Sequence, residues 1–292
     1  MFRRAPETNA RLHHLLPQGY MRRFSPDGRR VHVFDRQTGK YRFSATKNVA
    51  AKRDFYAMKS REGTTERWIE SRLAELDDAV GIFDKIERGE TITREERWRV
   101  AFFIGFAESR GIGFRNSAPP LSALDQSDDD EAFLARFAEA FRETSGVYLE
   151  PSVLKSLFIQ EFAHLADGFN ENSLMIATGF ELAMHLFWSN WLAGLAPAGS
   201  EFITSDRPLG LGTREGGFGE DPFDARLIRI FPLSPRAALF IAQPAELPSL
   251  ERNTLTDAAV RFANFAVARR AERNVIASSE LVLHAIVDVG IG

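Results

Sequence analysis

The sequence contains no cysteine. This absence excludes a disulfide framework, a metal site built on thiolates and a cysteine nucleophile. A divalent metal stays open as a cofactor, but its ligands would have to be His, Asp or Glu side chains.

Long apolar runs are also missing. No stretch reaches the roughly 18 consecutive apolar residues of a membrane-spanning helix, and the N-terminal residues MFRRAPETNARLHHLLP lack the apolar centre of a signal peptide. We therefore expect a cytoplasmic protein that does not associate with a membrane.

The signatures of several large enzyme classes are absent as well. The chain has no P-loop, no Gly-x-Gly-x-x-Gly fingerprint, no Gly-x-Ser-x-Gly elbow and no His-Glu-x-x-His pair. P-loop nucleotide hydrolysis, dinucleotide-dependent redox chemistry and the common serine hydrolases therefore lose support, and no zinc-finger or helix-turn-helix signature appears.

The composition is that of a folded protein, since 44% of the 292 residues are hydrophobic and 26% are charged. We expect a single domain over residues 1–292. A subdivision into residues 1–116 and 131–292 stays open, because the segment between them is rich in proline and then acidic.

Charge is strongly segregated along the chain. Residues 1–60 contain 14 Lys and Arg against 4 Asp and Glu, whereas the whole chain has a net charge of −3. The basic segment either forms a surface for a polyanion such as nucleic acid or docks on the acidic remainder of the protein.

Hydrophobic periodicity predicts an α+β fold with a mostly helical body. Residues 171–195 are apolar nearly all round, which is typical of a helix enclosed by other elements. Around this central helix we expect a small antiparallel sheet from the C-terminal half and an N-terminal hairpin. Further helices are predicted from Thr65 to Phe83, after Thr93, and over residues 131–145, 152–167 and 256–273.

The first candidate site residues flank a rigid step near the N-terminus. Pro17 fixes one backbone angle and holds the preceding residue extended, so His14 and Gln18 lie on either side of a defined geometry. An imidazole there could act as a general acid or base or as a metal ligand, and the amide could position a substrate. The alternative is that both side chains satisfy buried backbone groups.

A second candidate is the strand end at residues 202–208. An apolar strand runs into Ser205 and Asp206 where the chain must turn, a common place for a catalytic carboxylate. The alternative is an Asx-turn. Arg110, at the end of the helix after Thr93, could bind a phosphate or carboxylate with two parallel hydrogen bonds, or could simply complement the helix dipole.

Glu181 and His185 form a third candidate, because they lie one turn apart on the most apolar helix. They could pair with each other. They could also supply two ligands to a divalent metal, with Asp206 or His14 completing the site.

Three motifs together resemble a known family. They are similar, in order and separation, to the recurrent motifs of the uncharacterised domain-of-unknown-function family numbered 4238: His14-x-x-Pro17-Gln18-x-Tyr20, Phe202-Ile203-Thr204-Ser205-Asp206-Arg207-Pro208 and Phe231-Pro232-Leu233-Ser234-Pro235. Met21, where the family pattern usually has Leu, is a volume-conserving departure. The resemblance implies recurring motif residues but no reaction.

From these residues we expect a hydrolase acting on a phosphodiester or nucleic-acid substrate, with or without a metal. His14 and Asp206 would be catalytic, and substrate would be bound by Gln18, Tyr20, Arg110 and Ser205. Replacing Asp206 by alanine would then abolish activity at little cost in stability. The alternative is a non-enzymatic module that binds nucleic acid or a protein partner through the basic N-terminal segment.

Overall fold

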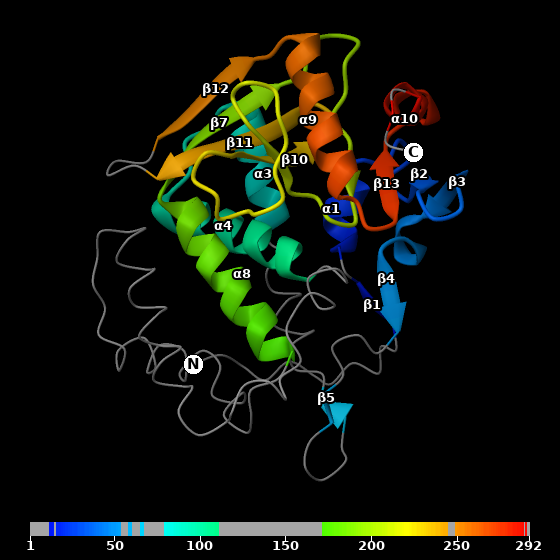
Figure 1. The fold of residues 1–292 in the computed structure, drawn as a ribbon, viewed down its shortest axis with the longest axis horizontal. Helices are drawn as coiled ribbons and strands as arrows, with labels where there is room; N and C mark the ends of the chain where they lie inside the picture. The colour runs from blue at the N-terminus through cyan, green and yellow to red at the C-terminus, as the bar shows by residue number, and fades with distance from the viewer. Residues whose placement is uncertain are drawn as a thin grey trace.

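The computed structural model describes residues 12–14, 16–53, 58–59, 65–66, 79–110, 171–244, 249–288 and 290 (Figure 1). These residues form one sheet of five strands, one of four, two strand pairs and six α-helices. Within them, no helix is long and apolar enough to cross a membrane.

The five-stranded sheet is covered by helices on both faces. Its strand order is β12 (Leu250–Thr254), β7 (Ser189–Leu195), β11 (Ala237–Pro244), β10 (Ile228–Ser234) and β9 (Gly210–Gly212), antiparallel throughout except for the parallel β12 and β7. Ile230 packs in one apolar cluster with α9 (Asp257–Arg270). Its neighbour Phe231 packs in another, with α3 (Val80–Arg88), α4 (Arg94–Ser109) and α8 (Glu171–Phe187). Successive residues of β10 therefore face opposite helical layers, which explains its nearly continuous burial.

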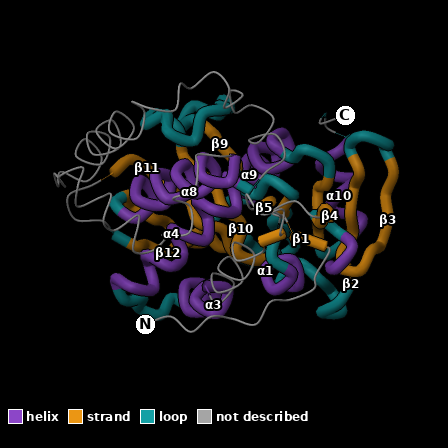
Figure 2. The backbone as a smooth tube through the Cα atoms, turned by 90° about the horizontal axis from the view of Figure 1, so that it is seen from below, coloured by secondary structure: helices purple, strands orange, loops and turns teal. Residues whose placement is uncertain are grey.

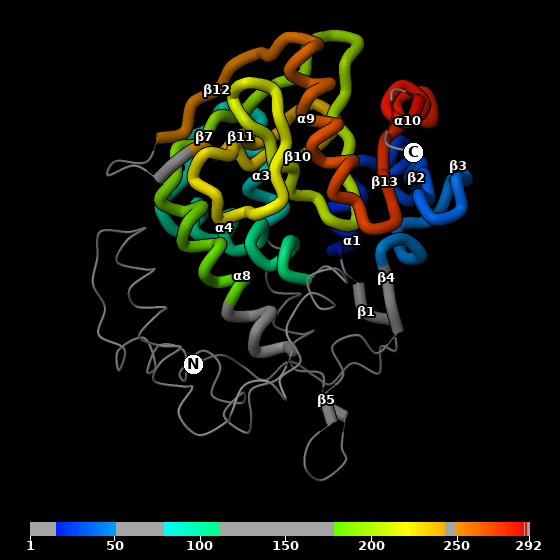
Figure 3. The backbone as a smooth tube through the Cα atoms, in the orientation of Figure 1, coloured from blue at the N-terminus to red at the C-terminus, as the bar shows by residue number. Residues whose placement is uncertain are grey.

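The four-stranded sheet joins the two ends of the chain. Its antiparallel order is β3 (Lys40–Ala45), β2 (Arg30–Asp35), β13 (Asn274–Ala277) and β8 (Thr204–Ser205), so an N-terminal strand pairs with a C-terminal one (Figure 3). Strands from both sides of the predicted 117–130 boundary thus share one sheet, while that boundary itself lies outside the described residues. Figure 2 places the β2 and β3 hairpin with α10 (Glu280–Val287) at one end of the molecule and β12 at the other.

The smaller elements lie near β2 and β3 in the sequence. They are α1 (Gln18–Arg22), the 3-10 turn η1 (Thr46–Asn48), the pair β1 (Leu12–His14) with β4 (Ala51–Arg53), and the pair β5 (Met58–Lys59) with β6 (Thr65–Glu66).

Local sequence signals explain the elements that were predicted correctly. The hairpin turns at Gly39, which has a φ of 66° that suits glycine. The α4 helix begins after Thr93, whose side chain accepts from the backbone of Glu96 while the Glu96 side chain accepts from the backbone of Thr93.

The predicted central helix over residues 171–195 is wrong in about its last third. α8 ends at Phe187, and residues 189–195 form β7 between β11 and β12. The expectation of a mostly helical body with one small sheet is therefore also wrong, because the molecule is built around two sheets of five and four strands. The apolar residues of β7 are buried by sheet neighbours and by helices, so their pattern resembles that of an enclosed helix.

The helix predicted from Thr65 is wrong at its start, since Thr65 and Glu66 form β6. Its last part is α3, beginning at Val80, and residues 67–78 lie outside the described part of the chain. The helices predicted over residues 131–145 and 152–167 lie outside it too.

Candidate functional site

Tyr20 joins all three sequence motifs in the interior of the protein. Its hydroxyl donates to the carbonyl oxygen of Pro232 at 2.7 Å and shares a hydrogen bond with the Thr204 hydroxyl at 2.8 Å. The ring is fully buried and stacks on Phe231, with ring centroids 5.3 Å apart. Burial raises the pKa of Tyr20 above its ordinary value, so the phenol stays neutral. The predicted substrate-binding residue Tyr20 is thus in contact with the core and with no surface.

Asp206 closes the turn that precedes β13. Its two oxygens accept from the backbone N–H groups of Glu272 (2.9 Å), Arg273 (3.0 Å) and Asn274 (2.8 Å), and from the Asn274 side chain at 3.1 Å. Burial raises the pKa of Asp206, and these four donors oppose that shift by stabilising the carboxylate. The Ser205 hydroxyl is held in the same way, between the backbone N–H and C=O of Arg207.

The remaining predicted site residues lie on α1, at the end of α4 and on β1. Gln18 begins α1, where its side chain accepts from Arg22 at 3.5 Å. Arg110 is buried at the C-terminus of α4, and its backbone N–H donates to Phe106. His14 pairs with Ala51 between β1 and β4, and its side chain lies outside the described part of the chain. Tyr20 and Ser205 are linked through β8, because the Tyr20 hydroxyl bonds to Thr204, the residue before Ser205.

A buried ion cluster lies where α4, α9 and the chain after β8 meet, and sequence analysis missed it. Glu108 Oε1 accepts from Arg207 Nε and Nη2 at 2.8 and 2.7 Å and from Arg270 Nη2 at 2.5 Å. The Glu108 and Arg270 side chains are only 4% and 1% exposed, so solvent does little to screen this attraction. The available signal was Glu108 itself, a carboxylate in the last turn of a helix, where the dipole is unfavourable to it.

Glu181 and His185, which could have paired or bound a metal, have no third metal ligand among the described residues, and the side chain of His14 lies outside them. Burial, reinforced by Asp221, raises the pKa of Glu181, whereas burial and the nearby Arg229 lower the pKa of His185 to about 4. Across the part of the chain that the structure describes, no three His, Asp or Glu side chains are close enough to hold a metal ion. Neither Asp206 nor any other described carboxylate therefore completes a three-ligand site with this pair.

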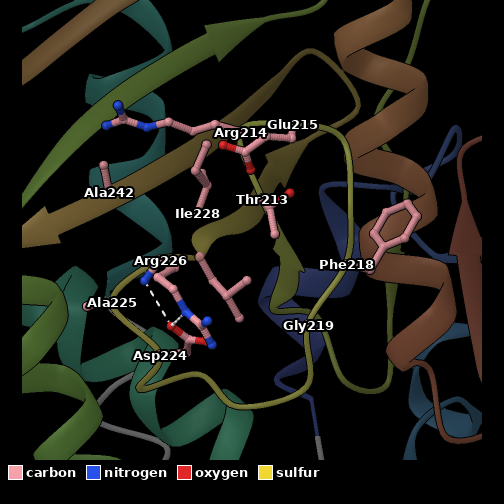
Figure 4. A pocket seen from close by; sticks show the side chains of 11 residues that line it. Thr213, Arg214, Glu215, Phe218, Gly219, Asp224, Ala225, Arg226, Ile228 and Ala242 are labelled. Carbon is pink, nitrogen blue, oxygen red and sulfur yellow. Dashed lines mark hydrogen bonds and ion pairs between the residues drawn. The ribbon is translucent and has the colours of Figure 1, made fainter.

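A cavity of about 650 Å³ lies between the turn at Thr213 and the start of β10 (Figure 4). Arg226 turns back to Asp224, with two ion-pair contacts of 3.0 and 2.7 Å that help to lower the pKa of Asp224 to about 2. Phe218 points toward α9, where it stacks on Phe262. None of the predicted site residues lines this cavity.

The N-terminal hairpin carries a row of aromatic rings that sequence analysis also missed, in which Phe43 is exposed and His32 and Tyr41 are half-buried. Phe43 is 42% exposed and stacks on His32 across the strand pair, with ring centroids 4.4 Å apart. The guanidinium of Arg30 lies 4.4 Å from the same Phe43 ring centroid. Tyr41 stacks on His284 of α10 at 4.1 Å. We call this surface the aromatic face: Arg30, His32, Tyr41, Phe43 and His284.

The protein therefore has two sheets covered by helices, and its three sequence motifs meet around Tyr20 in the core. The family model of the protein of unknown function DUF4238 matches residues 12–280, and the chain belongs to that family. No curated protein and no solved structure matches the chain.

Proposed function

We propose that this protein binds nucleic acid through its basic N-terminal hairpin. The observation that supports the proposal is the number of cations that the fold leaves in solvent there. Residues 16–50 contain 8 Lys and Arg but only 2 Asp and Glu. The exposed cations are Arg22, Arg29, Arg30, Lys40, Arg42 and Lys47.

Three cations of the segment dock on other parts of the protein, and one of them, Arg42, donates to the Asn274 side chain at 2.7 Å. Arg23 forms ion pairs with Asp84 and Glu87 of α3 at 2.5 and 3.1 Å. Arg36 donates to backbone carbonyls at the end of α9, among them that of Ala271 at 2.6 Å. Self-docking therefore accounts for part of the basic segment. Of the exposed cations, Arg30 also pairs with Asp27 at 2.9 Å. Arg29, Lys40 and Lys47 remain available to phosphates, which Lys and Arg bind with release of counterions.

The proposal is tested by reversing three exposed charges at once. Arg29, Lys40 and Lys47 make no side-chain hydrogen bond or ion pair within the described residues, so their change to glutamate leaves the fold intact. Binding of a labelled oligonucleotide is followed by fluorescence anisotropy between about 50 and 200 mM salt. We expect wild-type affinity to fall steeply with salt. The triple variant should bind more weakly, with a log–log slope shallower by about 2 to 3, because each lost phosphate contact removes about 0.7–0.9.

The matched control reverses three exposed arginines elsewhere, Arg214, Arg236 and Arg261. This variant has the same change in net charge, and we expect it to keep the wild-type slope. Absence of binding at low salt, or equal weakening in both triple variants, would overturn the proposal.

Hydrolysis of the bound nucleic acid stays a prediction from the sequence. The interior partners of Tyr20, Ser205 and Asp206 give it no support, since a group already saturated in the core is poorly placed to meet a substrate. Release of label from an oligonucleotide incubated with added manganese or zinc, compared between wild type and His14→Ala, tests the remaining candidate.

A further inference from the structure

The aromatic face occupies one side of the edge of the four-stranded sheet. β3 is the edge strand, and Tyr41 and Phe43 are two residues apart on it, so their rings point to the same side about 7 Å apart. Their cross-strand neighbours on β2 are Phe34 and His32. Some nucleic-acid-binding sheets carry aromatic rings at this spacing along a strand and stack successive unpaired bases on them.

Exposure distinguishes the Phe43 end of this row from the Tyr41 end, which packs against a buried apolar cluster. The side chains of Arg30 and His284 are 55% and 45% exposed, and Phe43 is one of three large apolar side chains that the described residues leave in solvent. The Phe43 ring lies between His32 and the guanidinium of Arg30, so the planar surface that faces solvent is the exposed guanidinium that the ring supports. The face of any base can stack on such a plane without a sequence-specific hydrogen bond.

Positive and negative charges lie on different sides of the rings. Lys40 and Arg42 alternate with Tyr41 and Phe43 along β3, so cations border the same edge from the other side of the strand. Burial raises the pKa of Tyr41, and the negative charges of Asp288 and Glu280 on the α10 side raise it further. The Glu280 carboxylate also lies 3.6 Å from the His284 imidazole. Phosphates are therefore repelled from α10 and attracted toward the hairpin, where the guanidinium of Arg30 lies over Phe43.

We propose that the aromatic face binds unpaired bases, so that the ligand of the basic hairpin is single-stranded nucleic acid with a base stacked on the Arg30 guanidinium that the Phe43 ring supports. This inference rests on the proposed function. In a duplex the base faces are covered by their neighbours, so only the phosphate contacts remain. Stacking thus adds affinity for the single strand alone.

The test compares one oligonucleotide as a single strand and as a duplex, with RNA and DNA versions of each. We expect tighter binding of the single strand. Phe43→Ala should weaken single-strand binding about ten-fold, a typical loss for one stacked base, and leave duplex binding and the salt slope unchanged. Phe43→Trp should keep the affinity and gain a fluorescence signal that the single strand quenches.

Phe218 supplies the matched control. It is 39% exposed and lies between Phe262 and the guanidinium of Arg269, as Phe43 lies between His32 and Arg30, but it is outside the basic hairpin. Phe218→Ala should not change binding. Equal losses for Phe43→Ala and Phe218→Ala, an equal loss for strand and duplex, or no quenching of the tryptophan would overturn the stacking inference while leaving salt-dependent binding intact. If no oligonucleotide binds wild type at low salt, the proposed function itself fails.

Discussion

At Asp206, four N–H groups converge on two carboxylate oxygens that are almost inaccessible to solvent. Each hydrogen bond stabilises the charge that burial disfavours, and together they fix the turn into β13. The side chain therefore acts on the backbone of residues 272–274. The sequence indicated a turn as the alternative to catalysis, but it could not show that the donors come from residues 66 to 68 positions further along the chain.

We predict that Asp206→Ala destabilises the protein by about 3–5 kcal/mol, because it leaves several buried N–H donors without an acceptor. The small stability cost expected from a catalytic role is thus replaced by a large one. Asp224→Ala is the control: Asp224 also accepts from the backbone and side chain of one residue, Arg226, but that arginine is 86% exposed. Its loss should cost much less, because solvent screens its pair with the exposed Arg226. Urea denaturation of both variants measures the difference, and similar midpoints would contradict the structural role of Asp206.

Among the elements, predictability follows the distance over which an element is determined. The α4 helix is specified within four residues by Thr93 and Glu96, and the β2 and β3 hairpin by its turn at Gly39, so both were predicted from sequence. β7 is specified by partners 40 to 60 residues away in β11 and β12. Its apolar residues fit a helix equally well, because periodicity does not identify a strand whose two faces are both buried.

The crossing of α4 and α8 was also hidden in the sequence. A Cβ added at Gly105 would lie 2.2 Å from the carbonyl oxygen of Gly179 and 2.9 Å from the backbone N of Ala183. The two helices therefore meet backbone to backbone. A glycine inside a helical pattern gives only a weak indication of such a contact, since the partner glycine lies on a distant helix.

We predict that Gly105→Ala destabilises the protein by about 1–3 kcal/mol, because the added methyl group must push two helix backbones apart. Gly81→Ala in α3 is the control, since a Cβ there meets nothing within 4 Å. That change should be neutral or stabilising by up to about 1 kcal/mol through the higher helix propensity of alanine. Thermal melts of the two variants give opposite shifts if the close crossing is real, and a Gly105→Ala melt equal to wild type would contradict it.

Across the whole molecule, charged side chains lie in two different environments, the surface and the interior. At the surface, the N-terminal hairpin exposes the cations to which we propose that nucleic acid binds, whereas inside the protein the Glu108 cluster links α4, the motif segment after β8 and α9. The net charge of each segment was readable from the sequence. Which arginines stay in solvent, as Arg29 does, and which find interior partners could not be read from it. Arg270, for example, pairs with Glu108, which is more than 150 positions away in the sequence.

We predict that Glu108→Gln destabilises the protein by about 3–5 kcal/mol, because two arginines that share one oxygen of Glu108 are left without a counter-charge. The loss should change little with added salt, since the Arg270 side chain is 1% exposed. Glu95→Gln is the control: Glu95 is 73% exposed, and its pair with Arg99 one turn away should contribute less than about 0.5 kcal/mol.

A double-mutant cycle with Arg270→Met separates the ion pair from the separate effects of the two side chains. The double variant should be more stable than the sum of the single losses implies, because removing both charges removes the cost of burying an unpaired one. Denaturant unfolding at low and high salt measures the coupling. A coupling near zero, or one that disappears in high salt, would show that Glu108 and Arg270 do not form a dry ion pair holding the motif segment to the two helices.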